Sequence, residues 1–161
     1  MTSLEKNLVI KKSKIPGAGL GLFAKIPFRK GDRVVEYKGR REPWKKVKAQ
    51  DGYNGYLLRL NRTTAINALP YKKAFGRFAN DANGLGRTAG LSNNAEYLIY
   101  DDRCFIEATH SINKGEEILV SYGHEFWALQ RKLRTEYKER TNVRLVEQLA
   151  NGQRPMAKSR Q

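Results

Sequence analysis

The sequence predicts a mainly β single domain made of several small sheets, followed by C-terminal helices. Short apolar or alternating runs, each bounded by Gly, Pro, Asn or Asp, recur along residues 1–127, which is typical of short strands joined by tight turns. After residue 127 the apolar residues recur at helical spacing instead. A chain of 161 residues is long enough for one domain with its own core, and we do not expect two independent domains.

The N-terminal part of the chain contributes most of the expected strands. Strands are predicted at residues 8–10, 33–39, 55–60 and 64–68. A Gly-rich β-turn segment at 17–24 and a turn at 28–32 separate the first two, and a short basic helix is expected within 45–50.

The Gly-rich segment invites comparison with a dinucleotide-binding fingerprint. That fingerprint requires a third glycine where this chain has Leu22, and Phe23 to Pro27 does not open a helix. Two interpretations remain, either a tight turn without a ligand or bare backbone lying against a flat ligand.

The middle of the chain alternates between turn-rich and strand-like segments. Residues 71–83 show helical spacing, and 84–90 read as a flexible loop. Strands are expected at 95–100 and 103–108 around a turn at Asp101-Asp102. Residues 115–120 then form a turn and a short strand that ends at Tyr122-Gly123. A tyrosine at a strand end can be a catalytic hydroxyl, or it can simply pack its ring at the edge of the core.

The C-terminal segment is predicted to form two helices, over residues 125–140 and 142–150, with Asn142 as an N-cap. Their apolar stripe packs on the β body or forms the face of a homodimer. Residues 153–161 are basic and lack an apolar run, which is typical of a disordered tail. The predicted division is therefore 1–127, 128–152 and 153–161.

The charge of the chain is high and unevenly distributed. The net charge is +15, with 14 basic against 4 acidic residues in 1–50, 8 against 9 in 51–127, and 9 against 3 in 128–161. Two basic ends around a near-neutral middle favour contact with a polyanion through the ends. Lysines that only keep the protein soluble would give the same pattern.

Several classes of site are disfavoured by the composition. Cys104 is the only cysteine, so an internal disulfide and a thiolate zinc cluster are excluded, and two histidines make a histidine-built metal site improbable. The first residues lack an apolar signal core, and no run has membrane-spanning length. We therefore expect an intracellular protein with no membrane partner and no metal.

Several motifs, taken in order, resemble the SET domain of protein lysine methyltransferases. They are GLGLFA from Gly19, KGDRVVEYKG from Lys30, AINA from Ala65, GRFAND from Gly76, NNAEY from Asn93 and GEEILVSYG from Gly115. The resemblance covers residues 10–127. It implies a β-clip fold of small sheets, in which the Asn segment and the Tyr-Gly ending form a pseudoknot-like crossing.

The resemblance also implies an S-adenosylmethionine site on one face and a lysine channel that enters from the other. Tyr122 would be the catalytic tyrosine, and the channel would be lined by Tyr37, Tyr97 and Val120. The cofactor-binding residues implied are Gly19, Leu20, Gly21, Arg77, Phe78, Asn80, Asp81 and Trp127. The target lysine has an unperturbed pKa of about 10.4, so burial beside a sulfonium would help to make its amine neutral and nucleophilic.

The chain departs from the family pattern at three points. The usual Asn-His is Asn80-Asp81, so the histidine side chain is lost, and the usual Pro-Asn is Asn93-Asn94 after a longer link. Val120 stands where the family often has an aromatic residue that influences the number of methyl groups added. The flanking zinc-binding cysteine clusters are absent, so Phe126, Trp127 and the following helix are the candidates to complete the cofactor site.

The sequence therefore predicts a protein-lysine N-methyltransferase. Its expected substrate is a basic, nucleic-acid-associated protein, such as a histone, a histone-like or DNA-binding protein, or a ribosomal protein. The expected location is cytoplasmic, or on the nucleoid or chromatin. The alternative is a catalytically impaired SET-fold module that binds nucleic acid or chromatin, since Asp81 replaces the family histidine and both ends are basic.

Overall fold

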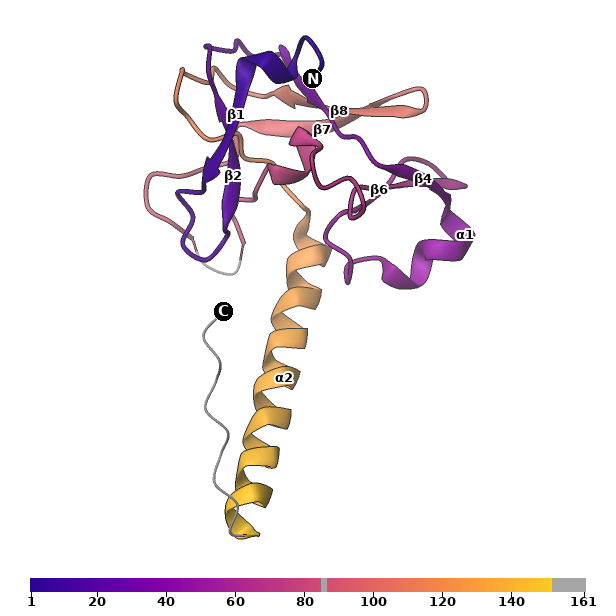
Figure 1. Ribbon diagram of the computed structural model, residues 1–161, viewed down its shortest axis with the longest axis vertical. Coiled ribbons are helices and arrows are strands. Elements are labelled where there is room, and N and C mark those ends of the chain that lie inside the picture. The colour runs from indigo at the N-terminus through magenta and orange to yellow at the C-terminus, as the bar shows by residue number, and fades with distance from the viewer. Residues whose placement is uncertain (85–86, 152–161) are drawn as a thin grey trace.

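The computed structural model describes residues 1–84 and 87–151. In this part of the chain, small antiparallel sheets form the body and one long helix projects from it (Figure 1). The sheets are β1–β2, β3–β8–β7 and β4–β6–β5. The strands are β1 Leu8–Lys12, β2 Leu20–Ala24, β3 Arg33–Glu36, β4 Arg40–Pro43, β5 Leu57–Arg59, β6 Thr64–Asn67, β7 Ala95–Tyr100 and β8 Arg103–Ala108. The helical segments are η1 Glu5–Asn7, α1 Trp44–Val47, η2 Lys48–Gln50, η3 Phe75–Phe78 and α2 His124–Ala150.

Tight turns give the hairpins their register. Strands β1 and β2 pair from Leu8 with Ala24 to Lys12 with Leu20, and the connecting loop contains Gly17 and Gly19 at positive φ. Strands β7 and β8 pair along their full length around Asp101, whose φ is +53°. Asp is one of the few residues that tolerates this left-handed conformation.

Most of the expected strands are confirmed, with two differences in the first half of the chain. Strand β4 was not predicted, because its basic residues look like a polar connection; it forms by pairing with β6 from Arg40 opposite Asn67 to Pro43 opposite Thr64. The helical spacing at 71–83 gives only the four-residue 3-10 helix η3, since Asn80 and the residues after it enter the chain crossing.

The predicted crossing is formed by residues 117–120. This segment was expected to be a strand, but it makes isolated bridges to three separate parts of the chain, at Phe23, Asn80 and Ala95. The amide of Val120 donates to the carbonyl of Asn80 at 2.8 Å. The segment before Tyr122 is therefore held between the residues that follow η3 and the start of β7. These contacts fix the position of the Tyr122 backbone.

Two hydrophobic clusters lie beneath the sheets. The larger joins β2, β3, β8 and the crossing, with Leu22, Val34, Ile106 and Val120 fully buried. The smaller lies under β4–β6–β5 and contains Tyr37 and Cys104. Cys104 is a free, buried thiol, as its strand context predicted.

The two predicted C-terminal helices are a single helix, α2, which runs from His124 to Ala150 without a break. Thr141 and Asn142 were expected to interrupt it. Instead the Thr141 hydroxyl donates to the carbonyl of Tyr137 at 2.8 Å, so this polar side chain is satisfied inside the helix. The helix begins before residue 127, so the predicted boundary at 127/128 falls within its first turns.

Only the first turns of α2 contact the body. The side chain of Leu129 packs on Gly52, and the Gln130 amide donates to the Gly52 carbonyl. Farther along, Tyr137, Val143 and Val146 are exposed, and Figure 1 shows this part of α2 projecting away from the sheets. Of the two predicted roles of the apolar stripe, packing on the body is therefore seen only near the start of the helix, and the homodimer face stays a prediction.

The predicted basic tail and part of the predicted loop at 84–90 lie outside the described residues. Among the described helices, none combines the length and the apolar character that crossing a membrane requires.

Candidate active site

Tyr122 lies where three cavities meet. Each cavity is named here after one residue that lines it. They are the Tyr37 cavity of about 590 Å³, the Arg77 cavity of about 400 Å³ and the Trp127 cavity of about 550 Å³. Tyr122 lines all three. The half-buried Tyr122 thus borders one cavity beside β5 and the start of α2 and two cavities beside the Gly-rich loop.

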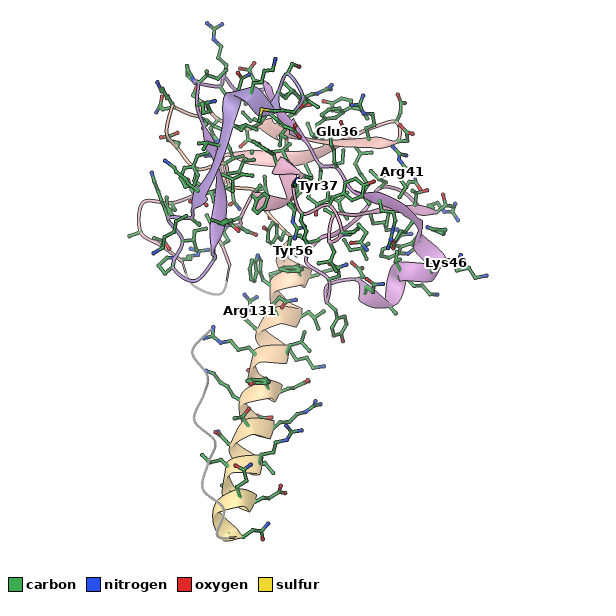
Figure 2. The ribbon with its side chains drawn as sticks, viewed as in Figure 1. Glu36, Tyr37, Arg41, Lys46, Tyr56 and Arg131 are labelled. Atoms are coloured by element: carbon green, nitrogen blue, oxygen red, sulfur yellow. The ribbon has the colours of Figure 1, made fainter. Side chains whose placement is uncertain are left out.

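The Tyr37 cavity has aromatic walls. Tyr37 and Tyr97 meet edge to face, with ring centroids 5.6 Å apart and an interplanar angle of 84°. The Tyr37 hydroxyl donates to the Tyr56 carbonyl at 3.0 Å, and Figure 2 shows both residues near the place where α2 begins. Its lining also includes two acidic residues, Asp51 and Glu125, and one basic residue, Arg59. The cavity therefore combines an aromatic lining with charged groups of both signs.

The Arg77 cavity is bounded by η3 and the Gly-rich loop. It is lined by Ala18, Leu20, Gly55, Tyr56, Arg77, Phe78, Asn80 and Tyr122. The Arg77 guanidinium lies over the Tyr56 ring, 4.0 Å from its centroid, and donates through one Nη to the carbonyls of Ala68 and Leu69. Its Nε is buried and has no partner among the described residues. An orphaned, buried donor of this kind is typical of a ligand site.

The Trp127 cavity is built from the Gly-rich loop and α2 together. Its lining includes residues 15–18 and Asn80, Asp81, Gly84, Tyr122, Trp127 and Arg134. The Trp127 ring stacks on the Tyr122 ring with centroids 5.8 Å apart and planes at 12°. A Cβ added at Gly84 would lie 3.0 Å from the Trp127 ring, so the indole is closely packed.

Asp81 is buried beside this cavity and accepts four hydrogen bonds from N–H donors. Oδ2 accepts from the Tyr122 amide at 2.8 Å and from the Trp127 indole at 2.7 Å. Oδ1 accepts from the Asn83 amide at 2.8 Å and from the Asn93 side chain at 2.9 Å. A carboxylate is an acceptor-only group with room for four donors, so this environment suits it.

A second buried carboxylate, that of Glu117, holds the segment around the Gly-rich loop through hydrogen bonds. Glu117 accepts from the Ser13 hydroxyl at 2.6 Å, the Lys14 amide at 2.9 Å and the Asn80 side chain at 3.2 Å. A Cβ at Gly21 would lie 2.2 Å from Glu117 Oε1, so only glycine fits there. The Gly-rich motif thus has a structural reason as well as a position beside the cavities.

The tyrosines around Tyr122 are held in their neutral form. Burial raises the pKa of Tyr37, Tyr97 and Tyr122 above the usual value for a phenol. The Tyr122 hydroxyl donates to the main-chain carbonyl of Ala79. Its proton is thereby directed at the backbone, and the oxygen lone pairs remain available to accept a hydrogen bond.

The structure brings together nearly all the residues that the sequence singled out. Tyr37 and Tyr97 line the Tyr37 cavity; Leu20, Arg77, Phe78 and Asn80 line the Arg77 cavity; Asp81 and Trp127 line the Trp127 cavity. Gly19 takes a positive φ of 74° in the adjoining loop, and Gly21 packs on Glu117. Val120 lies instead inside the larger hydrophobic cluster, fully buried.

Several lining residues escaped the sequence analysis, among them Arg134 and Tyr56. Arg134 lies two turns after Trp127, and this spacing on one helix face could have been recognised once a continuous helix was assumed. Tyr56 carries the Arg77 guanidinium on its ring and accepts from Tyr37 through its carbonyl. No local pattern marks Tyr56, because these contacts join segments distant in the sequence.

Comparisons with known proteins give matches in both sequence and fold. A family model described as SET domain matches residues 19–123. The chain is 33% identical over 129 residues to N-lysine methyltransferase KMT5A of Xenopus tropicalis, covering 71% of this chain and 36% of that protein. It is 30% identical over 122 residues to N-lysine methyltransferase KMT5A-A of Danio rerio, covering 68% and 33%. The aligned region is thus about a third of these relatives' length.

A solved structure has a similar fold. It is a humanized mutant of the Chaetomium thermophilum Polycomb Repressive Complex 2 bound to the inhibitor GSK126. The match has a TM-score of 0.57 and 24% sequence identity, and it covers 72% of this chain and 15% of that chain. It supports the mainly β fold predicted from the sequence.

Proposed function

Because this chain belongs to the SET domain family, we propose that it is an S-adenosylmethionine-dependent protein-lysine N-methyltransferase. One observation carries the proposal: Tyr122 lines the Tyr37 cavity, the Arg77 cavity and the Trp127 cavity. A lysine in the first cavity and a cofactor in the other two would meet at this residue. A reaction that mainly requires alignment of two reactants needs this arrangement.

The cofactor assignment is supported by the groups that line the Arg77 and Trp127 cavities. Arg77 lines the Arg77 cavity, and its guanidinium would bind the carboxylate of the methionine moiety, since a guanidinium matches carboxylate geometry. Leu20, Phe78 and Asn80 would line the rest of that end, with the loop from Gly19 to Gly21 beside them. Trp127 and Asp81 would bound the other end. When bound, S-adenosylmethionine supplies an electrophilic methyl group on a sulfonium.

The Tyr37 cavity is suited to a lysine side chain. Tyr37 and Tyr97 offer aromatic faces to its aliphatic part and to its cationic head. Exclusion of water by these rings disfavours the charged amine and so lowers its pKa. The Tyr122 oxygen, whose own proton is engaged with Ala79, would accept an N–H from that amine and orient its lone pair. Val120, one layer behind in the core, would act on the channel only through its neighbours.

The proposed substrate is a basic, nucleic-acid-associated protein, such as a histone, a histone-like or DNA-binding protein, or a ribosomal protein. In a chain with net charge +15, the Tyr37 cavity is lined by two acidic residues, Asp51 and Glu125, against one basic residue, Arg59. The basic N-terminal part, with Arg41 on β4 and Lys46 on α1 (Figure 2), would contact the nucleic acid to which the substrate is bound. The protein would then work on the nucleoid or chromatin, or in the cytoplasm on ribosomal proteins.

The rival proposal is a catalytically impaired module that binds nucleic acid. Its support was Asp81, which replaces a histidine of the family pattern. In the structure all four lone-pair sites of Asp81 are used by donors from the site itself. An environment that satisfies the carboxylate so fully favours a site adapted to Asp81, and so favours the enzyme.

The decisive experiment separates cofactor binding from methyl transfer. The protein is titrated with S-adenosylmethionine by calorimetry, and then incubated with methyl-labelled cofactor and a panel of histones, bacterial DNA-binding proteins and ribosomal proteins. We expect binding heat and label on lysine in at least one substrate. Binding without transfer to any protein of a lysate from the source would contradict the substrate assignment, and absence of both would favour the rival.

A further inference from the structure

We propose that Asp81 is a positioning residue, which holds the Tyr122 backbone and the Trp127 indole in one fixed relation through a single carboxylate oxygen. Oδ2 accepts from the Tyr122 amide at 2.8 Å and from the Trp127 indole at 2.7 Å. One oxygen atom thus links the backbone of Tyr122, whose side chain carries the hydroxyl, to Trp127 in the first turn of α2. This inference rests on the proposed function for its kinetic consequences, but not for its geometry.

The surroundings of Asp81 are built for an acceptor-only group. Every one of its four partners is a donor, and the side chain is 4% exposed. Neutral imidazole has one acceptor nitrogen, so a histidine would leave most of these donors unsatisfied. Each buried donor left without a partner costs about 1–3 kcal/mol. The site therefore requires Asp81.

Asn93 completes this arrangement and explains a second departure from the family pattern. Its Nδ2 donates to Asp81 Oδ1 at 2.9 Å, while its Oδ1 accepts from the Ala82 amide at 2.9 Å. The amide is therefore used at both ends, and its orientation is fixed. Asp81 and Asn93 are two of the positions at which the chain departs from the family pattern. Their side chains are hydrogen-bonded to each other, so the two departures form one coupled feature.

Two consequences follow for the two elements that Asp81 joins. The hydrogen bond from the Tyr122 backbone N–H to Asp81 fixes the backbone of Tyr122, and so the position from which its hydroxyl reaches the reacting amine. A displacement of about 1 Å at such a position can lower the rate by about 10²-fold. The indole bond fixes Trp127, which stacks on the Tyr122 ring and closes the Trp127 cavity. Releasing Asp81 should therefore disturb both catalysis and cofactor binding.

The test uses Asp81→Asn, Trp127→Phe and their double variant in the full chain. Asparagine has one oxygen, so in either orientation it turns an NH₂ toward two of the four donors. We expect a loss of about tenfold or more in S-adenosylmethionine affinity by calorimetry for each single variant. The double variant should lose no more than the worse single variant, because both disturb the same contact between Asp81 and Trp127. In Asp81→Asn, kcat should fall while KM for a lysine peptide stays constant.

Asp32→Asn is the matched control, because it removes the same charge at an exposed turn where one donor, the Arg29 amide, needs only one oxygen. A readout independent of activity is the indole N–H resonance of Trp127 in a Trp44→Phe background. We expect it to be protected from hydrogen exchange, and to shift and lose protection in Asp81→Asn but not in Asp32→Asn. The proposal would be overturned if the affinity losses of the two single variants simply added in the double variant. It would also be overturned if Asp81→Asn matched the control in affinity, kcat and indole resonance.

Two outcomes need separate treatment. If Asp81→Asn does not fold, Trp127→Phe and the wild-type indole decide: unchanged cofactor affinity together with an unprotected indole would overturn the proposal. If the wild-type protein binds no S-adenosylmethionine, the proposed function fails. The indole resonance in Asp81→Asn then still decides whether Asp81 positions Trp127.

Discussion

The rings of Tyr122 and Trp127 lie stacked, with centroids 5.8 Å apart and planes inclined by 12°. Phe126 meets Tyr122 edge to face at 5.3 Å. The Tyr122 ring is thus held by two aromatic side chains of α2, independently of its hydroxyl. This allows the hydroxyl to be removed without moving the ring.

The first prediction is that Tyr122→Phe lowers kcat by about 10²-fold or more, because the oxygen that orients the amine is lost. S-adenosylmethionine affinity should stay within a few fold, since the ring stack is kept. Steady-state kinetics and calorimetry measure the two effects. Tyr53→Phe, at a residue that is 64% exposed, is the control and should leave both unchanged. Full activity in Tyr122→Phe would remove the residue from its assigned role.

Arg77→Lys should weaken S-adenosylmethionine binding by about tenfold, because lysine keeps the charge but loses the planar guanidinium that matches a carboxylate. The contact with the Tyr56 ring would also weaken. Calorimetry measures the affinity, with the exposed Arg62→Lys as the matched control. Equal affinities in the two variants would show that Arg77 is purely structural.

Alkaline pH should unfold the protein through its buried tyrosines. Burial raises the pKa of Tyr37, Tyr97 and Tyr122 above the ordinary value of 10.0, so the folded state holds these protons more tightly than the unfolded state. This contribution to stability is complete below about pH 10 and is lost as the pH rises beyond it. Ultraviolet absorbance of phenolate and circular dichroism should show these tyrosines ionising together with unfolding. Reversible ionisation of all tyrosines in a protein that stays folded would contradict this expectation.

Gly21→Ala should destabilise the fold by about 1–3 kcal/mol, because the added methyl would displace Glu117 from its bonds to Ser13 and Lys14. Gly55→Ala is the control, since a Cβ there meets the Phe126 ring at an ordinary 3.7 Å. Urea denaturation followed by circular dichroism gives both free energies of unfolding. Equal values would mean that Glu117 moves aside without cost.

Nucleic-acid binding should weaken steeply with salt. Each phosphate contact contributes about −0.9 to the slope of log affinity against log salt concentration. Replacing the exposed Lys45, Lys46 and Lys48 by Gln should make that slope shallower. The same replacement at Arg62, Lys72 and Lys73, in the near-neutral middle of the sequence, should change it less. Fluorescence anisotropy with a labelled duplex measures the slopes, and no binding at low salt would refute the proposed contact.

Most elements of the body could be predicted from the sequence because their signals are local. Alternating apolar residues bounded by glycine or Asp-Asp turns predicted β1, β3 and the β7–β8 hairpin. Strand β4 could not be predicted, because its residues become a strand only by pairing with β6. The apparent break at Thr141-Asn142 was misleading for the opposite reason, since a long helix tolerates residues that disfavour helix locally.

The sequence by itself determined the family resemblance, the motif order and the candidate site residues, most of which line the cavities around Tyr122. These follow from residue types at fixed spacings. Only the tertiary structure decided the partners of Asp81, the orphaned Nε of Arg77 and the entry of Arg134 into the Trp127 cavity. Each depends on segments that are distant in the chain and meet only at the crossing of residues 117–120. Local patterns of apolar and polar residues do not predict contacts between segments that are distant in the chain.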